Sequence, residues 1–243
     1  RLSVFPGRPV LPDIVAKLNN ATGALDAVLA DLGGALNKSK TTNSLAFRGD
    51  LSNATTRALT AGRTTLNGEG LQHQDGHSLL NAIAYPTVRA YDPAFQYEIT
   101  TIVMHGLKAM YQDGETALYY LMLENDNYTH PEMPEGCEEG IVKGMYKVST
   151  REVDQAKGRV QLFGSGAIYN SVAKAQEILA EKYGVASDTW SVTSYTQLRR
   201  EADECRRWNM MHPTQPARKS YLETTLDGTE GPFISASDYV KAL

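Results

Sequence analysis

Apolar positions recur with two different periods along the chain and divide it into segments. In residues 13–36 they return every three or four positions, which predicts an amphipathic helix, or two short ones, ending near Gly33 and Gly34. Residues 37–61 are rich in Thr, Asn and Ser and predict a loop or linker. From Gly62 onward, short apolar runs alternate with helical patterns, which is typical of an α/β fold.

Residues 82–140 predict a first strand–helix–strand unit and a linker. Alternation in 82–92 predicts one strand or two short ones, with Pro86 at a sheet edge or as a break. Asp92 followed by Pro93 predicts the start of a helix that runs to about Met110. The continuous apolar run 117–123 predicts a buried parallel strand. Prolines and acidic residues in 125–140 predict a linker between domains.

A second α/β unit follows this linker. The pattern predicts strands at 158–166 and 188–194 and helices at 168–184 and 195–209, the first helix ending at Gly184. This order of elements predicts a parallel sheet with right-handed crossovers.

The composition divides the chain at about the same place as the pattern. Of its 243 residues 42% are hydrophobic and 21% are charged, which is enough apolar material for a core. The formal net charge is −4, so the chain as a whole has no electrostatic signature of nucleic-acid binding. Residues 1–61 contain no Glu, His, Tyr or Trp and carry +3, and the remainder carries −7. We interpret this shift as two segments of different origin or role.

Two further features concern the cellular setting. No apolar run is long enough to span a membrane, so we expect no membrane association. Cys137 and Cys205 are too few for a disulfide framework and do not form a CxxC motif. A reduced, cytoplasmic location is therefore expected.

The densest group of polar residues lies in 62–78, GRTTLNGEGLQHQDGHS. Glycines in this stretch allow tight turns and a close approach to a ligand, and imidazoles can donate hydrogen bonds or move protons near neutral pH. His73 and His77 are therefore the candidate catalytic residues, and a polar surface loop is the equally weighted alternative. Zinc fits less well because Gly76 interrupts the spacing and no HExxH order occurs. We predict no metal ligand.

A second glycine motif, GSG at 164–166, follows one predicted strand and precedes a predicted helix. Such a helix N-terminus can hold a phosphate, but the motif lacks the full GxGxxG pattern. A tight strand-to-helix turn is the favoured interpretation.

Long stretches of the sequence resemble one known family. Four of these stretches resemble the homodimeric bacterial pyruvate dehydrogenase E1 component, which is a thiamine-diphosphate enzyme of the transketolase superfamily. They are AGRTTLNGEGLQHQDGHS (61–78), YDPAFQYEI (91–99), YYLMLENDNYTHPEMPEG (119–136) and VQLFGSGAI (160–168). The match continues through 191–213 and 235–243, and so covers 61–243. A transketolase is the weaker alternative, because the stretch GRTTLNGEGLQH fits E1 better.

The resemblance implies a fold and a division into domains. Residues 61–135 are expected to be the second half of a pyrimidine-binding α/β domain. Residues 136–243 are expected to be a truncated transketolase C-terminal-type α/β domain with a parallel sheet. Residues 1–60 stay an unassigned helical or linker segment.

The resemblance also implies an activity, cofactors and partners. The family decarboxylates pyruvate and transfers the acetyl group to the lipoyl group of the E2 dihydrolipoyl acetyltransferase, using thiamine diphosphate and Mg²⁺. The implied role of His73 and His77 is a hydrogen bond to a substrate-derived oxygen, with Asn67, Glu69 and Asp75 near the cofactor or substrate. Leu79 departs from the family, in which a further His often follows DGHS. A homodimer, or assembly with the missing E1 domains, is implied.

Several parts of the family's active site are absent from the sequence. No Gly-Asp-Gly motif for the diphosphate and Mg²⁺ occurs, and the half-domain that carries the activating glutamate does not match. We therefore expect the chain alone to lack catalysis. The alternative is a non-catalytic remnant of E1 that serves as a dimerisation or interaction module.

Overall fold

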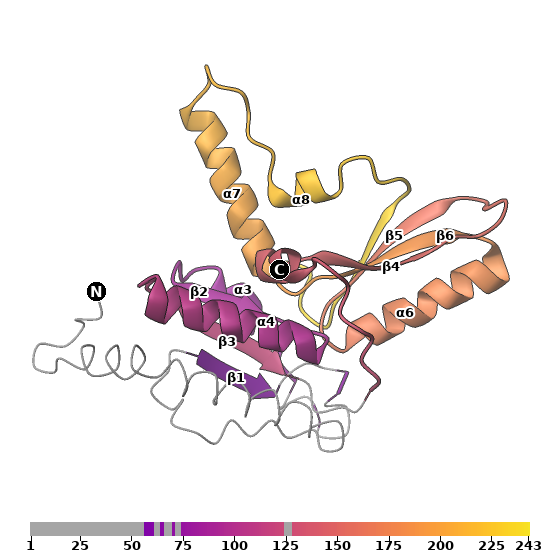
Figure 1. Cartoon of the computed structure of the whole chain (residues 1–243), viewed down its shortest axis with the longest axis horizontal. Coiled ribbons are helices and arrows are strands. Elements are labelled where there is room, and N and C mark those ends of the chain that lie inside the picture. Colours follow the sequence, from indigo (N-terminus) through magenta and orange to yellow (C-terminus); the bar gives the residue numbers. More distant parts are fainter. Residues whose placement is uncertain (1–55, 61–63, 66–69, 71–73, 124–127) are drawn as a thin grey trace, which may run out of the picture.

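The computed structural model describes residues 64–65, 70, 74–123 and 128–243, and the backbone of 56–60. These residues form two α/β units, each built on its own sheet (Figure 1). The prediction of an α/β fold is confirmed. The helix predicted for 13–36 lies outside the described residues.

The sheet of the first unit has the strand order β1-β3-β2 and is entirely parallel. Its strands are β1 (Thr56–Thr60), β2 (Val88–Tyr91) and β3 (Leu118–Leu123). The run 117–123 therefore forms the buried central strand that its sequence predicts. The other strand prediction is confirmed only for its second half, because β2 begins two residues after Pro86 and lies at a sheet edge.

Strand β1 corrects the prediction of a loop over 37–61. Thr56 pairs with Tyr119 and Thr60 with Leu123, so five residues of the compositionally distinct segment belong to this sheet. Local composition did not identify the strand because Thr- and Ser-rich sequences are common in loops. Pairing with a central strand about sixty residues away in the sequence supplies the backbone hydrogen bonds that local sequence does not encode.

Helices α3 (Ser78–Ala82) and α4 (Gln96–Leu107) accompany this sheet, and a π-helical turn, η3 (Lys108–Gln112), continues α4. The predicted start of α4 at Asp92 is wrong, because the capping residue is Phe95. The carboxylate of Glu98 reaches back to accept hydrogen bonds from the Ala94 and Phe95 amides at 2.6 and 3.1 Å. The helix therefore begins where these amides find their acceptor.

The connection between the units includes an extended stretch and a short helix. Residues 128–136 have no helix or strand, as predicted, but α5 (Glu138–Lys143) begins inside the predicted linker of 125–140. Gly144 ends α5 with a φ of +116°, a backbone conformation that residues other than glycine rarely adopt. A Cβ at this position would lie 2.6 Å from the Ser194 carbonyl oxygen.

The sheet of the second unit has the order β4-β6-β5-β7. Its strands are β4 (Tyr146–Arg151), β5 (Arg159–Gly164), β6 (Ala186–Ser191) and β7 (Phe233–Ala236). Strand β5 is parallel to β6, as predicted, and also to β7, whereas β4 is antiparallel to β6. Neither β4 nor β7 was predicted from the sequence. Both lie at sheet edges, where strands carry polar and exposed residues.

Three helices belong to this unit. Helix α6 (Ile168–Ile178) continues as the π-helical turn η4 (Leu179–Tyr183) and ends at Gly184 with a φ of +66°, which confirms the predicted stop. Helix α7 (Tyr195–Met211) is capped by the Ser194 hydroxyl, which accepts from the Gln197 amide, and projects away from both sheets (Figure 1). Helix α8 (Tyr221–Thr225) follows. No described helix is long and apolar enough to cross a membrane.

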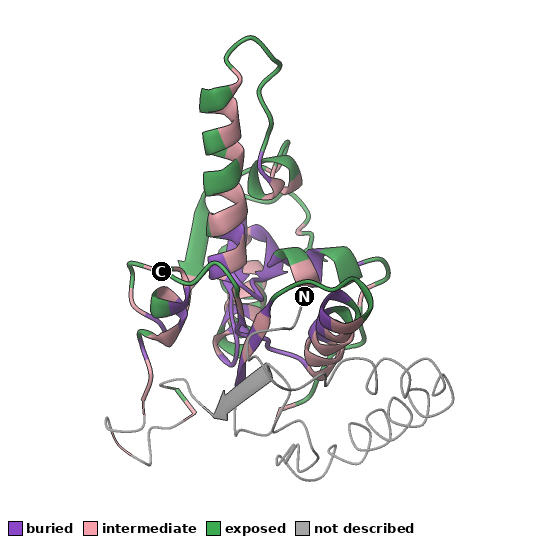
Figure 2. Cartoon of the chain, turned by 90° about the vertical axis from the view of Figure 1, so that its left-hand side faces the viewer, coloured by how far each residue is buried: buried purple, intermediate pink, exposed green. Residues whose placement is uncertain are grey.

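The two units share one core. The cluster formed by Tyr91, Ile102, Tyr119 and Leu121 of the first unit also contains Ile141 and Tyr146 of the second. Buried residues accordingly gather where the two units meet (Figure 2). The relative placement of the sheets is therefore fixed by packing, which burial of apolar surface stabilises.

Candidate functional site

The described end of the candidate histidine loop is a tight turn built around Asp75. Its Oδ1 accepts hydrogen bonds from the backbone amides of His77 and Ser78 at 3.0 and 3.1 Å. Its Oδ2 accepts a short hydrogen bond from the Ser78 hydroxyl. Asp75 therefore satisfies backbone donors at the start of α3, as aspartates before helices often do.

This environment favours the ionised form of Asp75. Partial burial opposes the charge, but the hydrogen bonds from Ser78 and from the His77 amide outweigh it, so the pKa of Asp75 lies below its usual value. The charged carboxylate of Asp75 therefore stabilises the turn that contains His77, whose side chain is exposed.

Only part of the predicted site falls within the described residues. The structure brings Asp75 and His77 into one turn. Asn67, Glu69 and His73 lie outside the described residues. Leu79, the position that departs from the family pattern, is buried against Ala82, Ala90 and Met122 and serves packing.

The C-terminal residues contact both described ends of this loop. The backbone amide and the hydroxyl of Thr64 donate to the two carboxylate oxygens of Asp238 at 3.0 and 2.7 Å. The Val240 amide donates to the Gly76 carbonyl at 3.1 Å. Sequence analysis did not find Asp238 because 174 positions separate it from Thr64.

A buried carboxylate joins the two units near the start of α4. Glu98 is 0% exposed, and its Oε1 accepts hydrogen bonds from the hydroxyls of Tyr146 and Ser191 at 2.7 and 2.6 Å. Its Oε2 accepts from the Ala94 and Phe95 amides. Burial disfavours the charge more than these donors favour it, so the pKa of Glu98 is raised. The sequence analysis assigned Glu98 no role.

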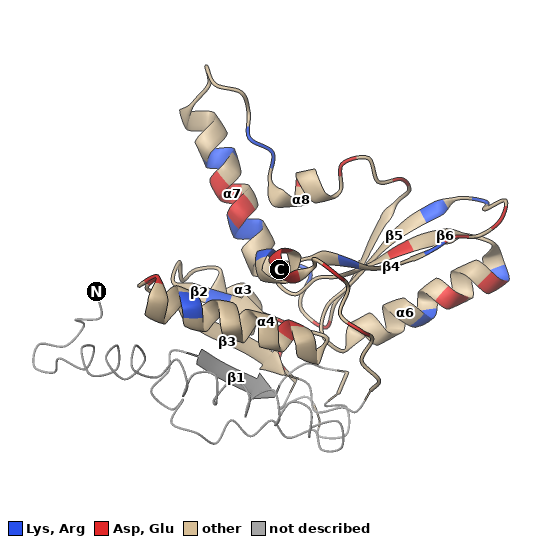
Figure 3. Cartoon of the chain, in the orientation of Figure 1, with Lys and Arg blue, Asp and Glu red and all other residues tan. Residues whose placement is uncertain are grey.

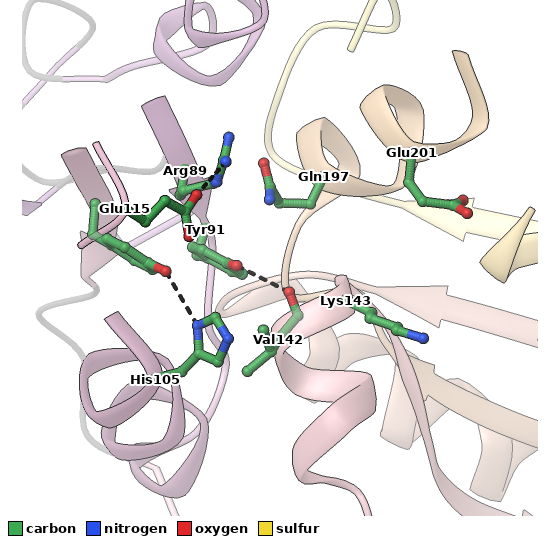
Figure 4. A pocket seen from close by; sticks show the side chains of 9 residues that line it. Arg89, Tyr91, His105, Glu115, Val142, Lys143, Gln197 and Glu201 are labelled. Carbon is green, nitrogen blue, oxygen red and sulfur yellow. Dashed lines mark hydrogen bonds and ion pairs between the residues drawn. The ribbon is translucent and has the colours of Figure 1, made fainter. Parts of the chain in front are cut away.

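A small cleft of about 200 Å³ also lies between the units (Figure 4). The Tyr91 hydroxyl donates to the Val142 carbonyl at 2.9 Å, and Arg89 pairs with Glu115. His105 Nδ1 lies 3.1 Å from the Tyr119 hydroxyl. Burial, as the largest influence, raises the pKa of Tyr119 to about 12. The polar groups named here already bond one another, so the cleft has the character of a domain junction.

The basic residues of α7 do not form a uniform positive face. Figure 3 shows basic and acidic residues distributed along α7. The Arg200 guanidinium donates to the Val88 and Tyr85 carbonyls at 2.9 and 3.1 Å, and so attaches α7 to β2. Arg206 pairs with Asp203 at the surface.

The glycine motif 164–166 forms a tight turn. Gly166 has a φ of +49°, its amide donates to the Asp92 carbonyl at 3.1 Å, and a Cβ would lie 2.6 Å from Asp92 Oδ1. The buried side chain of Asp92 thus lies next to the N-terminus of α6, at the place where a bound phosphate would have to lie. This geometry favours the interpretation as a turn.

Mg²⁺ takes oxygen ligands in proteins, commonly one or two carboxylates together with phosphate oxygens of the bound group. Within the described ranges there is no group of three or more His, Cys, Asp or Glu side chains that could hold a metal ion. The described residues therefore show no side-chain cluster dedicated to the Mg²⁺ of the family's cofactor.

Comparison with known proteins gives matches to two family models. Residues 40–131 match the pyruvate dehydrogenase E1 component middle domain, and residues 144–243 match the transketolase-like C-terminal domain. Over 183 residues the chain is 49% identical to the pyruvate dehydrogenase E1 component of Escherichia coli, and over 184 residues it is 48% identical to that of Cupriavidus necator. These alignments cover 75% and 76% of this chain.

The chain spans a small share of these relatives, 20% and 21% of their lengths. Among solved structures, a mutant transketolase from Pichia stipitis aligns with a TM-score of 0.50 and 16% identity. The alignment covers 74% of this chain and 25% of that one, and at this identity it shows the fold alone. The two domain matches and the identity to curated relatives together show that the chain belongs to the bacterial pyruvate dehydrogenase E1 family, with its transketolase-like C-terminal domain.

Proposed function

We propose that the chain is the part of a pyruvate dehydrogenase E1 enzyme that carries the histidine loop and works together with the remaining E1 domains. The observation that carries this proposal is the 49% identity over 183 residues, which includes the loop and both α/β units. The reaction is the oxidative decarboxylation of pyruvate followed by transfer of the acetyl group to a lipoyl group on E2. Homodimeric assembly and a cytoplasmic location belong to the same proposal.

The histidines are the residues through which the chain acts on substrate. His73 and His77, with Asn67 and Glu69 nearby in sequence, donate hydrogen bonds to a substrate-derived oxygen or carboxylate. Asp75 supports this role because its charged carboxylate fixes the backbone of the turn that carries His77. The exposed side chain of His77 leaves it accessible to a substrate bound against neighbouring domains.

Thiamine diphosphate, when bound, supplies a carbanion that attacks the keto carbon of pyruvate. The described residues provide no group of ligands for its Mg²⁺, and the sequence has no Gly-Asp-Gly motif. We therefore assign cofactor binding to the remaining E1 domains and expect no catalysis from this chain alone.

Complementation tests the proposal. The chain is mixed with the E1 domains that it lacks, thiamine diphosphate, Mg²⁺, pyruvate and a lipoyl domain, and acetyl-lipoyl formation is measured. We expect activity in the complete mixture, loss of most of it with His73→Ala or His77→Ala, and no loss with His212→Gln at the far end of α7. An inactive mixture, or equal activity of all three variants, would contradict the proposal.

A non-catalytic interaction module is the second candidate. The observation that favours it is the shift in composition before residue 62, which marks a segment unlike the rest of the chain. Complementation separates the candidates, because neither of them expects the isolated chain to bind thiamine diphosphate and Mg²⁺ tightly. Inactive complementation would favour the non-catalytic module, and tight binding in calorimetry of the isolated chain would rule it out.

A further inference from the structure

The contact between Thr64 and Asp238 has the form of a two-point attachment. One carboxylate oxygen of Asp238 accepts a hydrogen bond from the Thr64 backbone amide, and the other accepts one from the Thr64 hydroxyl. Thr64 is therefore fixed in both position and orientation. Hydrogen bonds to an ionised acceptor are stronger than neutral ones. This attachment lies at the first described position of the histidine loop.

A second attachment lies at the other end of the loop. The Val240 amide donates to the Gly76 carbonyl at 3.1 Å, within the turn that Asp75 holds. Between the two attachments, the buried Tyr239 packs against Leu79, Ala90 and Met122 of the first unit. Three consecutive residues, 238–240, therefore contact the first unit at the loop and beside it.

The same segment is also bound to the second unit. The Ser165 hydroxyl donates to the Ser237 hydroxyl at 3.3 Å, next to the end of β5, and the Arg199 guanidinium of α7 donates to the Ala242 carbonyl at 3.2 Å. Residues 237–243, here named the C-terminal strap, thus lie between the second unit and both described ends of the histidine loop.

We infer that the C-terminal strap positions the two described ends of the histidine loop, Thr64 and the Gly76–His77 turn, with Asp238 as the positioning residue. The inference rests on the proposed function for the role of the loop in the reaction, but the attachment itself is a property of this chain. Asp238 acts through Thr64, and its effect reaches the Gly76–His77 turn because Val240 is only two residues further along the strap.

Amide hydrogen exchange of the full chain, resolved by residue, tests the attachment. In Asp238→Asn we expect exchange of the Thr64 and Val240 amides to accelerate about tenfold, as for the loss of a hydrogen bond to a charged group. Amides of β5 and β6 keep their protection. Thr64→Val, which removes one of the two donors, changes the same amides in the same direction. The double variant exceeds the larger single effect only slightly, because both changes break one contact.

Asp227→Asn is the matched control. Asp227 also forms an exposed 2.8 Å contact, with Lys219, but it lies before β7 in the sequence, and its removal leaves the loop amides unchanged. Three results would overturn the inference: unchanged exchange at Thr64 and Val240 in Asp238→Asn, equal acceleration throughout the chain, or strictly additive effects of the two substitutions.

Activity in the complemented E1 mixture provides a second readout. Asp238→Asn is expected to lower kcat more than it raises KM for pyruvate, because it misplaces a group that acts on bound substrate. A rise in KM with kcat unchanged would contradict positioning of the histidines. If the wild-type mixture is inactive, the proposed function fails, while the exchange measurements still decide whether the strap holds the loop.

Discussion

The hydroxyl of Tyr146 donates a 2.7 Å hydrogen bond to Glu98 Oε1, which joins β4 of the second unit to α4 of the first. The Tyr97 hydroxyl lies 2.7 Å from that of Tyr146 and extends this contact into a chain of hydroxyls. Glu98 therefore has donors of two kinds: backbone amides with fixed direction at Oε2, and hydroxyls that can rotate at Oε1.

Substitution of Glu98 should separate these two kinds of donor. Glu98→Ala leaves two amides and two hydroxyls without an acceptor in the interior, and we expect it to lower the free energy of unfolding by roughly 3 kcal/mol or more. Glu98→Gln keeps an oxygen for the amides, and the hydroxyls can rotate to accept from its NH₂ group. Its cost should be about 1 kcal/mol. Urea denaturation measures both values.

The matched control is Glu139→Gln, which removes an exposed charge that pairs with Lys143. Its stability should equal that of the wild type, because exposed ion pairs contribute little. Equal losses in Glu98→Ala and Glu98→Gln would contradict rotation of the hydroxyls.

The pKa of Glu98 gives the protein a specific dependence on pH. Burial raises this pKa above its ordinary value of 4.5, so the folded state binds a proton more readily than the unfolded state. The stabilising contribution of Glu98 is therefore full below pH 4.5 and declines as the pH rises through the higher folded-state pKa. The stability difference between wild type and Glu98→Gln should shrink as the pH rises above 4.5. Denaturation curves across this range measure it, and a difference that grows with pH would refute the assignment.

Two glycines should respond oppositely to alanine. Gly144→Ala places a Cβ 2.6 Å from the Ser194 carbonyl at a φ of +116°, and we expect it to destabilise the fold by roughly 2 kcal/mol or more. Gly158→Ala meets nothing within 4 Å and should be neutral or stabilising by up to about 1 kcal/mol. Thermal unfolding of both variants provides the comparison, and a smaller loss for Gly144→Ala than for Gly158→Ala would be inconsistent with the turn.

Cys137 should react slowly with alkylating reagents. Burial, as the main influence, raises the pKa of its thiol from 9.0 to about 11, which reduces the thiolate fraction near neutral pH about a hundredfold. Peptide mapping after treatment with iodoacetamide should show alkylation of Cys137 only when the chain is unfolded in urea. Modification at the same rate in native and unfolded chains would show that the site is open.

The fold was predictable where the signal is local. The apolar run of β3 and the glycine that ends η4 could each be recognised from a few neighbouring residues. Strands β1, β4 and β7 carry no such signal, because edge strands tolerate polar side chains and take their pairing from distant segments. Helix α4 begins later than Asp92 and Pro93 predict because Glu98 supplies the cap from within the helix.

The candidate site divides in the same way. The turn of Asp75, His77 and Ser78 follows from residues within three positions of one another, so its spacing was informative. The attachment of Thr64 to Asp238 could not be found from local pattern, because it depends on how the second unit packs against the first. Glu98 was overlooked because its partners Tyr146 and Ser191 lie in strands of the other sheet.

Long-range attachment also has a consequence for the order of folding. The Ala90 carbonyl at the end of β2 accepts hydrogen bonds from the hydroxyls of Ser194 and Thr196, more than one hundred residues later. Contacts of such high sequence separation close large loops and form slowly, after local helices such as α6 and α7. During synthesis β2 leaves the ribosome well before Ser194 and Thr196, so the Ala90 carbonyl acquires these two donors only after the start of α7 has been made.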